Sequence, residues 1–312
     1  MKPSKLSAQV AEIQRLLDSL ATSLEAASTQ AAAHDFEGPL EDFEVTYRLS
    51  LEELATELPS CRIGTVDLSR VEYEKFLRSV IPWHETIGKR TDHKKKLELF
   101  ASYTLLGELL TGAYLDAAGG GFSYAGGIPA RRAVIQDLSI REAVRKRSGP
   151  SVEYLESSLS KIPLPDESID AISAHHAFEH FQGSADHDFI DEVQRILKPG
   201  GKAVIVPLFV SRSALEMTNR HDFDNWSIDP GRRVVDIEAT LPGKLSGNFA
   251  RIYDSVTFDT RVLSRIDGAK FEVSITELTL EGRPIPDPVV YKNHKVSNFN
   301  YPYRAFTLER LG

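Results

Sequence analysis

Residues 164–208 contain two short apolar runs, typical of strands, and between them a segment with apolar residues at helical spacing. This pattern predicts a strand, a helix and a second strand. Asp170–His175 is a short apolar run, typical of a buried strand. Asp188–Leu197 repeats apolar residues at helical spacing, and Lys198–Gly201 ends that helix because proline and glycine follow its last turn. Lys202–Val206 is apolar again, so the stretch predicts two parallel neighbouring strands joined by a right-handed crossover.

The N-terminal residues 4–33 carry a heptad pattern. Apolar positions are spaced alternately by four and three: Leu6, Val10, Ile13, Leu17, Leu20, Leu24 and Ala27. The pattern predicts either a coiled coil that makes a homo-oligomer or an amphipathic helix packed on its own domain. The flanking positions are largely uncharged, which favours self-association over a foreign partner. We treat 1–33 as a separate N-terminal helix.

The rest of the chain predicts an α/β domain at 97–312, preceded by a helical linker or cap at 34–96. Helices are expected at Ser50–Leu58, Ser69–Val80 and Asp92–Leu110. Further strands are expected at Tyr114–Asp116, Ala133–Asp137, Val152–Leu155, Phe271–Leu280 and Tyr303–Leu308, the last two as an antiparallel pair. Residues 207–250 are too long for a plain connection, so we expect an insertion that covers a substrate.

Composition describes an ordinary globular protein, with 41% hydrophobic and 26% charged residues. The net charge of −8 argues against a dedicated nucleic-acid binder. The single cysteine, Cys61, excludes an internal disulfide and a cysteine-based zinc site. No apolar run reaches the roughly 18 residues of a transmembrane helix, and no signal peptide is recognisable, so a cytoplasmic location is expected.

Three motifs in order carry a resemblance to a known family: Pro163–Asp170, His175–His180 and Leu197–Gly201. They resemble the class I S-adenosylmethionine-dependent methyltransferases, most closely the branch that acts on small molecules. The resemblance implies a Rossmann-like, seven-stranded, mostly parallel sheet with an N-terminal helical or coiled-coil extension. It also implies S-adenosyl-L-methionine as the cofactor and transferase activity.

A glycine-rich loop follows the predicted strand Tyr114–Asp116. Ligands of open parallel sheets bind at the carboxyl ends of the strands, where this loop lies. It resembles the family's first motif, which implies cofactor-binding roles for Asp116, Ala118, Gly119, Gly120 and Gly121. Ala118 and Phe122 stand where the family usually has glycines. A dinucleotide fingerprint from Gly119 would need a glycine at Tyr124, so a nicotinamide cofactor is disfavoured.

The ends of the next strands supply further candidates for cofactor binding. Asp137 and Leu138 resemble the second motif, in which the carboxylate holds both ribose hydroxyls. The alternative is that Asp137 or Ser139 caps a helix through Arg145. The resemblance also implies that Ser158 and Leu159 lie at the adenine, although the family usually has an acidic residue at the serine. His175 completes the cofactor set.

Histidine supplies the candidate catalytic groups, because an acceptor hydroxyl must lose a proton near neutral pH. His176 is the preferred base, with His180 as a second candidate and Glu179 placed to orient an imidazole. The structural alternative is that Glu179 and His180 support the loop whatever the substrate. The histidines and acids do not form a pattern typical of a metal site.

The sequence therefore favours O-methylation of a small molecule or carbohydrate. A catalytically silent methyltransferase-like scaffold remains an alternative, because Ala118, Phe122 and Ser158 depart from the family pattern. An RNA or protein methyltransferase is the other alternative. It would need Lys94–Lys96, Arg131-Arg132 and Arg145–Arg147 to form one basic face.

Overall fold

The computed structural model describes residues 49–82, 93–218, 233–236, 249–285 and 302–312. The chain divides into two compact units, one of residues 1–40 and 215–250 and one of residues 41–214 and 251–312. In the first unit the described elements are β7 (Leu215–Thr218) and β8 (Arg233–Asp236), a parallel pair. The heptad pattern lies outside the described residues, so the coiled coil stays a prediction.

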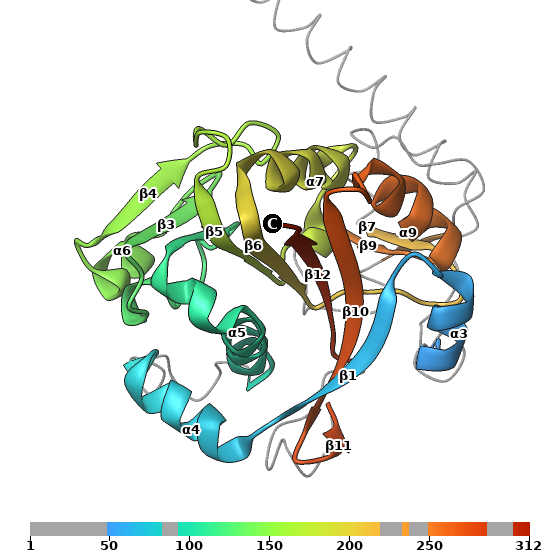
Figure 1. Ribbon diagram of the computed structural model, residues 1–312, viewed down its shortest axis with the longest axis horizontal. Helices are drawn as coiled ribbons and strands as arrows, with labels where there is room; N and C mark the ends of the chain where they lie inside the picture. The colour runs from blue at the N-terminus through green and yellow to red at the C-terminus, as the bar shows by residue number, and fades with distance from the viewer. Residues whose placement is uncertain (1–48, 83–92, 219–232, 237–248, 286–301) are drawn as a thin grey trace, which may run out of the picture. The chain divides into compact units, whose positions relative to one another are not determined.

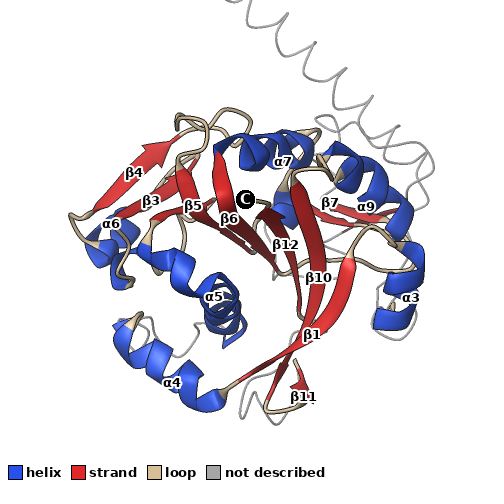
Figure 2. Cartoon of the chain, viewed as in Figure 1, coloured by secondary structure: helices blue, strands red, loops and turns tan. Residues whose placement is uncertain are grey.

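The second unit is built on one large, mostly parallel sheet (Figures 1 and 2). Its strands run in the order β1-β10-β12-β6-β5-β2-β3-β4, and β11 pairs with β10. The strands are β1 (Arg62–Leu68), β2 (Ala113–Ala117), β3 (Arg132–Asp137), β4 (Val152–Glu156), β5 (Ile169–His175), β6 (Leu197–Val206), β10 (Phe271–Leu280), β11 (Arg283–Pro284) and β12 (Arg304–Arg310). The Rossmann-like, mostly parallel architecture predicted from the sequence is confirmed, including the antiparallel pair β10 and β12. The sheet has nine strands among the described residues rather than the expected seven, because β1 and β11 extend it at the β10 side.

Helices cover both faces of this sheet, with α5 against one face and α7 against the other (Figure 1). The helices are α3 (Leu51–Glu57), α4 (Arg70–Ser79), α5 (His93–Leu106), α6 (Glu142–Ser148), α7 (Ala185–Ile196) and α9 (Ser255–Arg261). A short strand, β9 (Ala250–Ile252), precedes α9. Four side chains of α7 are fully buried in the core: Phe189, Ile190, Val193 and Ile196.

The region 34–96 is not wholly helical, as the sequence pattern suggested. Two helices are as expected: Ser50 forms a capping box with Glu53 at the start of α3, and Ser69 caps α4. Between them, however, β1 adds a strand that runs parallel to β10 from Arg62 to Leu68. The α/β domain was predicted to begin at residue 97, but its sheet includes this earlier strand.

The segment Lys198–Gly201 lies inside β6 rather than in a loop before it. The strand begins at Leu197, directly after α7, and its register with β5 shifts between Ile169 and Ala171. Gly200 takes a φ of 77°, a left-handed conformation that glycine adopts without strain. The motif ends α7 as predicted and accommodates the shift in register.

Candidate functional site

The predicted site residues all lie at or just after the carboxyl ends of four parallel strands. β5, β2, β3 and β4 are consecutive neighbours in the sheet and run in the same direction. The chain segments that leave them therefore lie along one edge. Open parallel sheets bind ligands at this edge.

The glycine loop after β2 is held close to β3. The amide of Gly119 donates to the carbonyl of Gln136 at 3.0 Å. A Cβ on Gly119 would lie 2.6 Å from the Asp116 carboxyl carbon, and one on Gly120 would lie 2.6 Å from the Ser139 carbonyl oxygen. A Cβ on Gly121 would meet nothing within 4 Å. The first two glycines are therefore required for close backbone approach, whereas the third is not.

Ala118 adopts the backbone conformation of the glycine that it replaces. Its φ is 56°, in the left-handed region where a Cβ is disfavoured. Its amide donates to the Gln136 side chain at 3.3 Å, which helps to hold the strained residue. The loop thus keeps the shape of a glycine-rich turn despite the substitution.

Asp137 contacts the glycine loop and does not cap a helix. Its Oδ2 accepts a hydrogen bond of 2.8 Å from the amide of Gly120. The N-cap of α6 is Arg141, which makes no side-chain capping bond, so the capping alternative is wrong for both Asp137 and Ser139. Leu138, the next residue, is 76% exposed beside this carboxylate.

Ser158 follows β4 and bonds within its own turn. Its Oγ lies 2.8 Å from the Ser160 hydroxyl and accepts a bond from the Ser160 amide. Leu159 is half-buried against the hydrophobic core. The geometry places both at the edge predicted for an adenine but shows no role for either beyond the local turn and core.

His175, the last residue of β5, bridges β2 and α5. Its Nδ1 lies 3.3 Å from Oδ1 of Asp116, which is fully buried. Its Nε2 lies 2.6 Å from the hydroxyl of Ser102, which is also near the Tyr124 phenol at 3.2 Å. The two ring nitrogens thus face the Asp116 carboxylate on one side and the Ser102 hydroxyl on the other. His175 is therefore a buried link behind the glycine loop.

His176 points to a different pair of acids, Glu179 and Glu98. Its Nδ1 lies 2.6 Å from Oε1 of Glu179. Burial alone would lower the pKa of His176, but the carboxylates of Glu98 and Glu179 outweigh it and raise the pKa to about 9. The imidazole is therefore protonated at neutral pH. That counts against the prediction that His176 is the general base, because an imidazolium has no lone pair to accept a proton.

Glu179 and His180 complete this cluster. Burial alone would raise the pKa of Glu179, but His176 and His180 hold it below its usual range. His180 Nε2 lies 3.7 Å from Oε1 of Glu179, and its ring packs against that of His176 with centroids 6.1 Å apart. The cluster joins a buried acid, Glu179, to two partly exposed histidines at the end of β5.

Sequence analysis missed Glu98 and Ser102. They lie one helical turn apart in α5 and are both fully buried. Polar residues at this spacing within the apolar run Leu97–Leu110 were the available signal, because residues four apart share one face of a helix.

A buried ion cluster fixes the loop that carries Glu179. Asp186 accepts bonds from Arg251 at 2.9 Å, from Tyr253 at 2.9 Å and from both Nε and Nη2 of Arg261. Arg251 also donates to the carbonyl of Phe181. These bonds tie the start of α7 to β9 and α9, and they stabilise the loop after β5.

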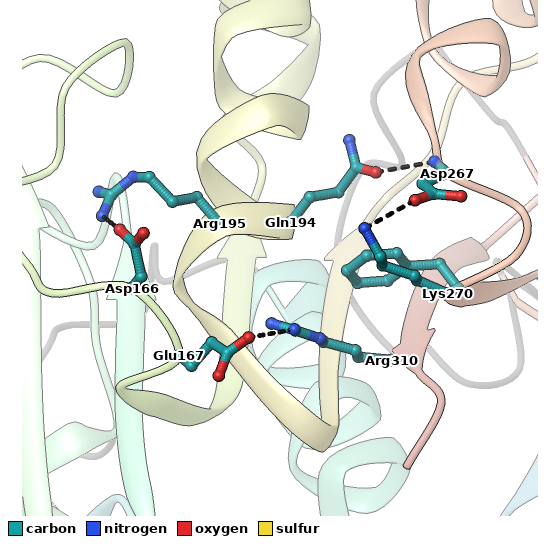
Figure 3. A pocket seen from close by; sticks show the side chains of 8 residues that line it. Asp166, Glu167, Gln194, Arg195, Asp267, Lys270 and Arg310 are labelled. Carbon is teal, nitrogen blue, oxygen red and sulfur yellow. Dashed lines mark hydrogen bonds and ion pairs between the residues drawn. The ribbon is translucent and has the colours of Figure 1, made fainter.

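A polar hollow of about 300 Å³ lies away from this site (Figure 3). It adjoins Asp166 and Glu167, which precede β5 at its amino end. Its acids pair with cations: Asp166 with Arg195 at 2.7 Å, Glu167 with Arg310, and Asp267 with Lys270 at 3.0 Å. We therefore place no function in the hollow.

Comparison with known proteins identifies the domain. Residues 129–205 match the family described as Methyltransferase domain. This match supports the class I S-adenosylmethionine-dependent methyltransferase superfamily that the sequence motifs predict. A demethylmenaquinone methyltransferase of Chlorobaculum tepidum is 33% identical over 89 residues, which cover 28% of this chain and 36% of that protein. The corresponding enzyme of Chlorobaculum parvum is 31% identical over 87 residues, 28% of this chain and 35% of that protein. The chain thus spans about a third of each curated relative.

Solved structures give a more distant likeness. An S-adenosylmethionine-dependent methyltransferase of Mesorhizobium loti is 17% identical, with a TM-score of 0.46 over 68% of this chain and 97% of that one. A 1,6-didemethyltoxoflavin-N1-methyltransferase of Burkholderia thailandensis is 14% identical, with a TM-score of 0.41 over 85% and 92%. Both scores are low, so the fold assignment rests on the strand order and on the matched domain.

Two other properties concern only the described residues. Within them, no helix is both long and apolar enough to cross a membrane. The same residues contain no group of three or more histidine, cysteine or acidic side chains arranged to hold a metal ion.

Proposed function

We propose that the chain transfers a methyl group from S-adenosylmethionine to a small molecule or glycan, with oxygen as the accepting atom. One observation carries the proposal: the glycine loop after β2 contacts the acidic residue at the end of β3. The bond from the Gly120 amide to Asp137 makes that contact, and Leu138 is exposed beside it. The matched methyltransferase domain supports the same cofactor.

The residues at the edge fit this cofactor. Gly119 and Gly120 let the loop pack directly on Asp116 and Asp137, because neither site has room for a Cβ, and this keeps the loop beside the carboxylate that would hold the ribose. Asp137 would hold the ribose hydroxyls through Oδ1 while Oδ2 keeps its bond to the loop. Leu138 offers an apolar surface for the adenine, and Ser158 a hydroxyl. When bound, S-adenosylmethionine supplies a methyl group on a positively charged sulfur.

The class of acceptor is inferred from the net charge and from the matched relatives. The net charge of −8 favours a small molecule or carbohydrate over RNA. Demethylmenaquinone, named for the matched relatives, would accept a methyl group on a ring carbon, so it is the acceptor that tests the choice of oxygen. Self-association through residues 4–33 and a cytoplasmic location complete the proposal.

Isothermal titration with S-adenosylmethionine and S-adenosylhomocysteine tests the cofactor. We expect saturable binding of both, and loss of binding in Gly120→Val, whose side chain would collide with Asp137 and the Ser139 carbonyl. Gly64→Val is the matched control, because that position in β1 is equally open and lies outside the glycine loop, and it should bind as the wild type does. A folded wild-type protein that gives no heat with millimolar ligand would favour the silent scaffold instead.

A further inference from the structure

We propose that Glu98 is the residue that accepts the proton of the acceptor hydroxyl during methyl transfer. The proposal rests on the function proposed above and adds a catalytic residue to it. Glu98 lies in α5, outside the motifs that identify the domain.

The first argument is the state of the Glu98 side chain. The residue is fully buried, and within the described part of the chain neither carboxyl oxygen has a hydrogen-bond partner. A buried carboxyl without a donor is costly, because it has given up its hydrogen bonds to water and gained none in the protein. Such groups in native proteins call for an explanation, and a ligand that brings a donor is one. An acceptor hydroxyl is such a donor.

The second argument is where Glu98 lies. Ser102, four residues later on the same helix face, contacts His175 at the end of β5. Glu98 is close enough to His176, the next residue, to raise its pKa. Glu98 lies one turn from Ser102 on the same helix face, and the Ser102–His175 contact thus holds α5 at the carboxyl end of β5. This is the edge at which the sheet is expected to bind its ligands.

The charges around Glu98 suit a proton acceptor. Burial raises the pKa of Glu98, Glu179 adds to the rise, and His176, Lys95 and His175 oppose it. A carboxyl whose pKa is raised toward neutrality is a better general base than an ordinary one. His176 is already protonated and cannot serve. It instead holds a positive charge against Glu179, and this charge also opposes the rise in the pKa of Glu98.

The step balances without another reactant. The acceptor oxygen bonds to the methyl carbon as the carbon–sulfur bond breaks, and that electron pair remains on sulfur. The hydroxyl proton passes to the ionised carboxylate of Glu98. Its return to water after product release restores the starting state.

Glu98→Gln tests the proposal, because it keeps the shape of the side chain and removes its basicity. The probe is methyl-labelled S-adenosylmethionine with a small-molecule extract of the cells that make the protein. We expect label incorporation to fall by about 10²- to 10⁴-fold, with the Kd for S-adenosylhomocysteine changed less than about threefold. Glu108→Gln, an exposed site beyond α5, is the matched control and should keep full incorporation.

Two further measurements separate the alternatives. NMR titration of the histidine rings, which needs no turnover, should show the pKa of His176 falling from about 9 in Glu98→Gln. An unchanged pKa, or incorporation within about threefold of wild type, overturns the proposal. The proposal is also overturned if Glu98→Gln binds S-adenosylhomocysteine weakly but 5′-methylthioadenosine normally. That result would show that Glu98 holds the cofactor's ammonium group. A wild-type protein that binds no cofactor, or transfers no label, refutes the proposed function instead.

Discussion

The hydroxyl of Ser102 lies 2.6 Å from Nε2 of His175 and joins helix α5 to the carboxyl end of β5. On its other side His175 faces the buried carboxylate of Asp116 at 3.3 Å. Helix α5 is thereby connected to β2, the strand that leads into the glycine loop. Loss of this connection should lower both the free energy of unfolding and the affinity for the cofactor.

Ser102→Ala leaves the buried Nε2 of His175 without its hydroxyl partner. We expect the free energy of unfolding to fall by about 1–3 kcal/mol in urea denaturation, and the affinity for S-adenosylhomocysteine to fall with it. Ser79→Ala is the control, because that hydroxyl bonds an exposed carbonyl of α4 and should change stability by less than about 0.5 kcal/mol. If Ser102→Ala is as stable as the wild type, the hydrogen bond between Ser102 and His175 does not contribute to the free energy of unfolding.

Ala118→Gly should stabilise the protein. Alanine in the left-handed region is strained by roughly 1–2 kcal/mol, whereas glycine adds about 0.4–1 kcal/mol of unfolded-state entropy. The expected net gain is about 0.5–1 kcal/mol in urea denaturation, with cofactor affinity equal or higher. Ala101→Gly, a buried site within α5, should instead lose stability. A loss at Ala118 would show that the neighbouring contacts need its methyl group.

Local patterns predicted most of this fold because its elements are locally encoded. The period of α7, the apolar runs of β3 and β5, and the capping box at Ser50 depend on residues a few positions apart. The strand β1 was missed because its partner, β10, lies about two hundred residues later, and only that pairing fixes Arg62–Leu68 as a strand.

The sequence motifs predicted only part of the candidate site. They located Gly119, Gly120 and Asp137 at one edge of the sheet. They could not decide between the two roles of Asp137, because an aspartate after a strand can serve a helix or a loop, and only the fold brings it to Gly120. The charge of His176 depends on Glu98, far away in sequence, so no local pattern revealed it.

Asp137→Ala should weaken cofactor binding without unfolding the protein. It removes the acceptor of the Gly120 amide and leaves the ribose hydroxyls unpaired, which we expect to lower affinity by about 1.5–3 kcal/mol. Asp137→Asn keeps one acceptor oxygen and should lie between. Asp166→Asn, at the amino end of β5, is the control for titration calorimetry. Unchanged affinity in a folded Asp137→Ala would limit the residue to shaping the loop.

Residues 4–33 should drive self-association. Ile13→Asp with Leu20→Asp places charges in a seam that must be apolar, so light scattering should report a smaller particle. Gln9→Asp with Gln14→Asp adds the same charge at flanking positions and should leave the mass unchanged. An unchanged mass in the seam variant would indicate that the helix packs on its own subunit.

Stability should fall as the pH rises past neutrality, because of His176. Its pKa is raised from 6.5 to about 9 in the folded state, so its stabilising contribution is complete below pH 6.5 and is lost as the pH rises through about 9. Urea denaturation across this window should show a steeper loss for the wild type than for His176→Gln. The control is His187→Gln: burial lowers the pKa of His187, so that residue is neutral across the window and its loss should leave the slope unchanged. Equal slopes for the wild type and His176→Gln would mean that His176 is neutral in the folded protein, and would return it to consideration as the base.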